Sequence, residues 1–117
     1  MTPEERIRLA GEFSTLADQF LAAGNSMVGA EMLWGAVTQV IIAVAIRRGE
    51  PIQDHQHRRQ TIRNLTGELN DATIRRNFGV AQRLHAHFYH NDMSDDILVS
   101  AVEKTRALID RLLPLAA

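Results

Sequence analysis

The chain of 117 residues contains no cysteine. This absence excludes disulfide bonds, thiolate metal sites and a cysteine nucleophile, and it fits a reducing compartment such as the cytoplasm. The N-terminus is acidic and has no apolar run, so we expect no signal peptide. The longest uncharged stretch, 32–46, is shorter than the ~20 apolar residues that span a bilayer. We therefore expect a cytoplasmic protein that does not enter a membrane.

Several motifs that would indicate a cofactor or a metal are also missing. The glycines are not spaced as a phosphate-binding loop. No Glu-x-x-His motif supports a carboxylate metal site, and His55 and His57 are too close in sequence to share one face of a helix. There is no internal repeat, low-complexity tract or linker. We therefore expect a single domain over residues 1–117, without a metal or cofactor.

Positive charge is concentrated in the middle of the chain, although the formal net charge is -1. Residues 47–90 carry eight arginines against four acids, and they hold all five histidines. Residues 1–46 carry two arginines against five acids, and residues 91–117 carry three cations against five acids. A basic segment of this kind attracts an anionic partner such as a phosphate or a nucleic acid. The alternative is an ordinary solvated face.

Helical periodicity without any strand alternation predicts an all-α fold, an up-and-down bundle of four long helices plus one short helix. Polar caps and breakers set the expected boundaries. The first expected helix begins at Thr2-Pro3, the second spans about 26–48, and the third is a short helix near 56–67. The fourth lies between Asp71 and Asn91, and the fifth runs from Ser94 to just before Pro114.

The second expected helix is apolar almost all round from Met32 to Ile46. Such a helix is normally buried on several sides, and the flanking helices of a small domain can leave part of it uncovered. We therefore expect a homodimer or higher homo-oligomer, with Trp34 as an interface anchor and Gly35 allowing close helix approach. The alternative is that Trp34 lies in the core of one chain.

The fourth expected helix carries the residues most suited to chemistry. With 3.6 residues per turn, one stripe holds cations and histidines, namely Arg76, Arg83, His87 and His90. The opposite stripe is mainly apolar and is expected to face the core: Ile74, Phe78, Ala81, His85 and Phe88. His85 is thus expected to be a core histidine, whereas the Arg/His stripe faces solvent, a ligand or a partner chain.

Arg83, His87 and His90 are the candidate catalytic residues. Histidine can take a proton from a ribose 2′-hydroxyl and can supply one to the leaving 5′-oxygen. Arginine stabilises the charge that develops on the phosphate. Arg76 and Tyr89 would extend the nucleic-acid contact. The alternative is that these side chains only lie on a solvated face.

Two runs of this sequence resemble a known family. Residues 29–36 (GAEMLWGA), followed by the apolar helix and Arg48-Gly49, are similar to the PaREP proteins, helical proteins first noticed as archaeal repeats. Residues 84–89 (LHAHFY) are similar to that family's Leu-His-x-Asn-Phe-Tyr pattern, with His87 in place of the Asn. PaREP proteins are related to the HEPN superfamily, whose domains are up-and-down helical bundles and often dimers.

The resemblance to HEPN domains implies a function. Many of them are metal-independent RNases of toxin and defence systems, with an Arg followed after four to six residues by a His, which Arg83 and His90 satisfy. The resemblance implies RNA or a nucleotide as ligand and an antitoxin-like protein as partner. Leu84 stands where the HEPN pattern usually has a polar residue, and several HEPN branches are non-catalytic. A non-catalytic helical dimerisation or interaction protein is therefore the alternative.

Overall fold

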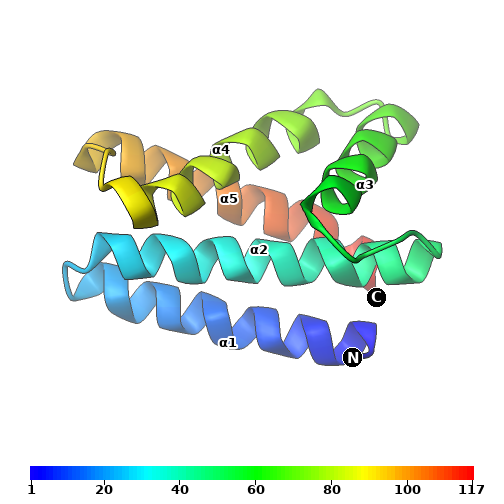
Figure 1. The fold of residues 1–117 in the computed structure, drawn as a ribbon, viewed down its shortest axis with the longest axis horizontal. Helices are drawn as coiled ribbons and strands as arrows, with labels where there is room; N and C mark the ends of the chain where they lie inside the picture. Colours follow the sequence, from blue (N-terminus) through cyan, green and yellow to red (C-terminus); the bar gives the residue numbers. More distant parts are fainter.

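The computed structural model describes all 117 residues, which form five helices and no strand. In chain order these are α1 (Pro3–Ala22), α2 (Ser26–Arg48), α3 (His55–Glu68), α4 (Ala72–His90) and α5 (Asp95–Ala116). Helices α1 and α2 run side by side, and α3, α4 and α5 pack on the remaining sides of α2 (Figure 1). The predicted all-α bundle of four long helices and one shorter helix is confirmed.

Each helix begins at a polar side chain that accepts a hydrogen bond from an otherwise free backbone amide of the first turn. These capping residues are Thr2, Asn25, Asp54, Asp71 and Ser94. Helix α2 ends at Gly49, whose φ of 69° lies in the left-handed region that favours glycine. The expected caps at Thr2, Asp71 and Ser94 and the stop at Gly49 are thus confirmed.

Helix α5 is longer than the sequence predicts. Pro114 lies inside its last turn, and the helix continues to Ala116. Ala116 is fully buried, and its carbonyl oxygen accepts a hydrogen bond from Arg47 Nε at 3.3 Å. Proline removes one amide donor, but this packing holds the final turn in place. The expected end before Pro114 is therefore wrong.

Helix α2 is the central element, because it contacts all four other helices. Its fully buried side chains include Leu33, Val37, Val40, Ile41 and Val44. One copy of the chain therefore covers most of this apolar helix. Helix α2 is long and apolar enough to cross a bilayer, but 67% of the relevant window is buried inside the bundle, as in the core helix of a soluble protein.

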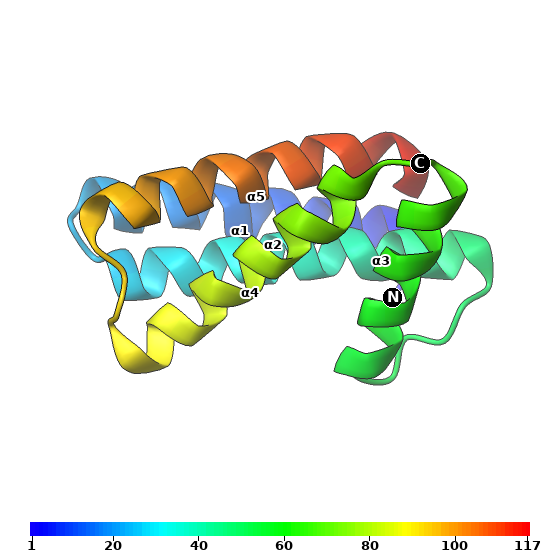
Figure 2. The same cartoon turned by 90° about the horizontal axis from the view of Figure 1, so that it is seen from above.

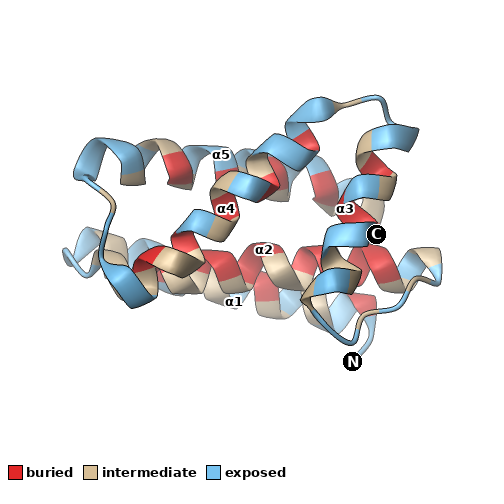
Figure 3. Cartoon of the chain, turned by 45° about the horizontal axis from the view of Figure 1, so that its top comes forward, coloured by how far each residue is buried: buried red, intermediate tan, exposed pale blue.

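Helices α3 and α4 form an outer layer, with α4 crossing the bundle diagonally (Figure 2). Their outward surfaces are mostly exposed (Figure 3). Helix α1 contacts α2 and α5 but neither α3 nor α4. A residue on α1 is therefore remote from the outer layer.

The close approach of α1 and α2 near their connection predicts opposite effects for two glycine substitutions. A Cβ at Gly29 would lie 2.7 Å from Leu21 Cγ and 3.2 Å from its backbone nitrogen, whereas a Cβ at Gly11 meets nothing within 4 Å. We expect Gly29→Ala to lower the free energy of unfolding by about 1–3 kcal/mol. Gly11→Ala should raise it by about 0.5–1 kcal/mol through helix propensity. Urea unfolding measures both, and an unchanged stability for Gly29→Ala would contradict the packing described.

Candidate phosphate-binding site

An open groove between α3 and α4 gathers three arginines. Arg59 and Arg63 come from α3, and Arg75 comes from α4. The groove has a volume of about 170 Å³, and its other lining residues are Ile62, Phe78, Gly79 and Gln82. Gly79 is exposed and has no side chain, so no side chain at this position of α4 projects into the groove. We call this feature the arginine groove.

The three arginines of this groove have no acidic partner within ion-pair distance, whereas four other arginines of the chain do. The paired arginines are Arg47 with Glu4, Arg48 with Glu50 and Glu68, Arg106 with Asp18, and Arg111 with Asp71. The guanidinium group keeps its charge at neutral pH and binds phosphate in a bidentate manner. The groove therefore offers several free phosphate donors in one place.

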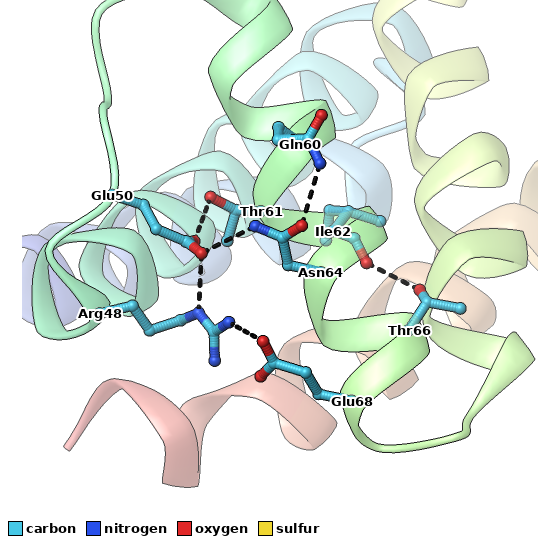
Figure 4. Close-up of polar contacts among 8 residues, drawn as sticks. All are labelled: Arg48, Glu50, Gln60, Thr61, Ile62, Asn64, Thr66 and Glu68. Carbon is cyan, nitrogen blue, oxygen red and sulfur yellow. Dashed lines mark hydrogen bonds and ion pairs between the residues drawn. The ribbon is translucent and has the colours of Figure 1, made fainter.

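Two acids near α3, Glu50 before the helix and Glu68 at its end, are held by other partners (Figure 4). Glu50 accepts hydrogen bonds from Thr61 at 2.9 Å and Asn64 at 2.8 Å, and it pairs with Arg48 at 3.2 Å. Partial burial opposes its ionisation, but the hydrogen bonds from Asn64, Thr61 and Arg48 lower the pKa of Glu50 overall. Glu68 pairs with Arg48 at 2.7 Å. Both carboxylates are thus ionised and directed to Arg48.

A cluster of aromatic and histidine side chains adjoins the arginine groove. Gln82 lines the groove and donates its amide N–H to His55 Nε2 at 2.8 Å. The His55 ring lies 6.0 Å from both Trp34 and Phe78. Burial lowers the pKa of His55 below its ordinary value of 6.5, and the neighbouring cations Arg58 and Arg59, together with His85, lower it further. His55 is therefore mainly neutral near pH 7.

His85 lies at the other side of Trp34. Its ring stacks on the indole at 5.5 Å with an interplanar angle of 28°. Its Nδ1 lies 2.8 and 3.0 Å from the two carboxylate oxygens of Glu31. The side chain of His85 is 44% exposed, so the expectation that it is a core histidine is wrong.

His87 is buried rather than solvent-facing, so its assignment to the exposed stripe is wrong. It is 1% exposed. Its Nδ1 accepts the backbone N–H of Met93 at 3.1 Å, and its Nε2 lies 3.1 Å from Ser26 Oγ. With Nδ1 acting as acceptor, Nε2 carries the proton and donates to the hydroxyl. His87 therefore joins α4 to the start of α2 and to the loop before α5, and it cannot contact an external substrate.

The oblique course of α4 explains why His85 is partly exposed and His87 is buried. Its buried positions are Ile74, Phe78, Ala81, Leu84 and His87. Most of these steps are three residues, so the buried line drifts around the helix from one end to the other. A helical wheel with one straight buried stripe therefore predicts the buried face correctly at the beginning of α4 and incorrectly at its end.

The other candidates on α4 lie on its exposed side but do not converge. Arg76, Arg83 and His90 are exposed, and Tyr89 is 66% exposed. Arg83 lines a separate groove of about 270 Å³ between α4 and α5, together with Lys104. Seven residues correspond to about 10 Å of helix rise between Arg83 and His90. These two side chains therefore start about two helical turns apart on the exposed side of α4.

Trp34 and Gly35 are used inside the chain. Trp34 is 8% exposed and packs against His55, Phe78 and His85. A Cβ at Gly35 would lie 3.4 Å from the Phe13 ring, so this glycine admits α1. The expected role of Trp34 as an interface anchor is therefore wrong, and the alternative that it belongs to the core is confirmed. Gly35 is partly buried, and its role between two copies of the chain stays a prediction.

The sequence alone did not single out Arg59, Arg63, Arg75, Gln82 or Glu31. The only sequence signal for the groove was the excess of arginine in residues 47–90. No three histidine, aspartate or glutamate side chains come together as a metal site.

The chain belongs to the archaeal PaREP1/PaREP8 family, whose model matches residues 5–109. No curated protein matches it. Among solved structures, it is similar to the crystal structure of a protein from Sulfolobus solfataricus, with 16% sequence identity and a TM-score of 0.79. That match covers 92% of this chain and 96% of the other chain, and at this identity it shows a shared fold only.

Substitution of the buried His87 and of the exposed His90, both at the end of α4, should have very different effects on the free energy of unfolding. His87→Ala leaves the Met93 amide without its acceptor and creates a cavity, so we expect a loss of about 2–4 kcal/mol in the free energy of unfolding. His90→Ala changes an exposed side chain and should stay within about 0.5 kcal/mol. Chemical denaturation measures both. Equal, small effects would contradict the buried position of His87.

The pKa of His55 should respond to the arginine groove. We expect its imidazole to titrate below pH 6.5 in an NMR titration, and Arg59→Gln to raise this pKa because a nearby positive charge is removed. The unfolded chain binds this proton at a higher pH than the folded chain does. Acidification below about pH 6.5 therefore weakens the contribution of His55 to stability. A His55 pKa that Arg59→Gln leaves unchanged would show that the two groups are not neighbours.

Proposed function

We propose that this member of the PaREP1/PaREP8 family binds the phosphates of RNA, or of a nucleotide, in the arginine groove. The observation that supports this most is the convergence of Arg59, Arg63 and Arg75 without an acidic partner in a chain whose net charge is -1. Three free guanidinium groups along one groove match successive phosphates better than a single small anion. The ligand would be an RNA or nucleotide of the cytoplasm.

The resemblance to HEPN domains adds a finer hypothesis, metal-independent cleavage of RNA by a toxin or defence protein. Arg83 would hold a phosphate and His90 would act as acid or base, with Arg76 extending the basic track. Because one stripe offers few groups, a two-fold dimer that pairs the stripes of two copies would make a more complete centre. A homodimer would supply it, and an antitoxin-like protein would then be a further partner.

One observation favours the non-catalytic alternative at that position. Leu84, which follows Arg83, is fully buried in the core, so this site lacks the polar residue usual in HEPN domains. His90 also has no hydrogen-bond or ion-pair partner that would orient its ring. The buried Leu84 and the unpartnered His90 are features expected of an interaction protein that binds RNA but does not cut it with Arg83 and His90.

Binding of a short, fluorescently labelled single-stranded RNA tests the proposed function. We expect salt-sensitive binding, with each of Arg59→Ala, Arg63→Ala and Arg75→Ala weakening affinity and lowering the slope of log K against log salt by about 0.7–1. Arg8→Ala is the matched control, since Arg8 is exposed, has no ion pair and lies on α1. Its affinity should stay at the wild-type value. Equal losses in the control and the groove variants, or no salt-sensitive binding, would reject the arginine groove.

A further inference from the structure

We propose that Glu31 and His85 form a carboxylate–imidazole dyad that cleaves RNA bound in the arginine groove. His85 is the general base and Glu31 is the positioning residue. This inference rests on the proposed RNA binding. It assigns the chemistry to a different histidine from the one that the Arg-to-His spacing indicates.

The hydrogen bond between Glu31 and His85 fixes the state of the imidazole. Both carboxylate oxygens of Glu31 lie within 3.0 Å of Nδ1, so Nδ1 carries the proton and donates it to the carboxylate. Nε2 then keeps a free lone pair. It has no protein partner and is not enclosed, in a side chain that is 44% exposed. A carboxylate in this position also stabilises the imidazolium that forms when Nε2 takes a proton.

Aromatic packing fixes the orientation of the same ring. Trp34 stacks on one face of His85, and Tyr89 meets the ring edge-on at 5.3 Å. Trp34 is itself almost fully buried, so it provides a rigid support from the core helix α2. An imidazole held by a carboxylate and a buried indole is preorganised, with its free nitrogen open to a substrate.

His85 follows the groove residue Gln82 along α4, although neither His85 nor Glu31 lines the groove itself. Gln82 lines the groove and precedes His85 by three residues, which is about 4.5 Å of helix rise. The chain of contacts from Gln82 through His55 to Trp34 and His85 is continuous. RNA with phosphates on the groove arginines would thus present a neighbouring ribose near Nε2. His55 is mainly neutral near pH 7 and adds little positive charge opposite His85.

The reaction is a transesterification that needs no metal and no water. Nε2 of His85 takes the proton of a ribose 2′-hydroxyl, and O2′ forms a bond to the adjacent phosphorus. The bond from phosphorus to O5′ breaks, and O5′ takes one proton from solvent. The imidazolium returns its proton to solvent. The products are a 2′,3′-cyclic phosphate and a 5′-hydroxyl, and the groove arginines stabilise the charge on the phosphoryl oxygens.

The experiment uses the full chain, a single-stranded RNA and EDTA. We expect wild type to release 2′,3′-cyclic phosphate ends, and RNA with a 2′-deoxyribose at the cut site to stay intact. His85→Ala should cut RNA at least about 100-fold more slowly than wild type, while its affinity for RNA stays within about twofold of the wild-type value. Added imidazole should restore part of its rate. This rescue would show that His85→Ala is folded.

Glu31→Gln and His90→Ala complete the test. Glu31→Gln keeps an acceptor for Nδ1 but removes the charge, so kcat should fall by about 10-fold or more with KM nearly unchanged. The control Arg8→Ala, on the exposed surface of α1, should cut at the wild-type rate. The inference is overturned if His85→Ala cuts like wild type, if His90→Ala alone abolishes cleavage, or if the products carry 5′-phosphates. Wild type that binds RNA without cutting it also overturns the dyad but leaves the proposed RNA binding intact, whereas absence of RNA binding overturns both.

Discussion

The burial of α2 is the constraint on which the rest of this structure depends. This helix is apolar on all sides, and the hydrophobic effect requires that every side be covered. The chain meets most of this requirement by itself, since α1, α3, α4 and α5 all pack against α2 and bury 67% of its apolar window. Trp34 and Gly35 both take part in that packing, Trp34 in the core and Gly35 against the Phe13 ring of α1. The apolar character of α2 is thus largely accounted for by packing within one chain.

Covering α2 also determines where polar groups meet. Helix α4 crosses the bundle obliquely (Figure 2), so its buried line drifts along the helix. As a result, His85 lies beside Glu31 and is partly exposed, while His87 is buried. Helix α3 faces α4 across the groove and places Arg59 and Arg63 opposite Arg75. Two nearby acids, Glu50 and Glu68, are engaged by Arg48. A chain with nearly balanced charge thereby acquires one locally positive groove.

The helices and their ends could be predicted from the sequence, because caps and breakers act over a few residues. Thr2, Asp71, Ser94 and Gly49 are examples, and Pro114 is the exception, because tertiary contacts of Ala116 hold the turn around it. Which residues of α4 form its buried face could not be predicted from the sequence in the same way. A helical wheel assumes a straight buried stripe, and the crossing angle that tilts the stripe depends on the neighbouring helices.

The candidate site illustrates the same distinction. Excess arginine in residues 47–90 indicated an anionic ligand, but the sequence could not show which arginines are already neutralised. Arg48 and Arg111 look like Arg59 and Arg75 in sequence, and only the fold shows that the first two are paired. Glu31 and His85 are 54 residues apart, so their hydrogen bond also follows only from the packing of α2 against α4.

The central claim is that the arginine groove is the surface that meets RNA. NMR chemical-shift mapping with a short single-stranded RNA tests it most directly, because each backbone amide reports separately. The account predicts that the largest changes fall on α3 and α4 around Arg63, Gly79 and Gln82, extend to His85, and leave α1 unchanged. Changes confined to α1 and α5, or no changes at any RNA concentration, would contradict it.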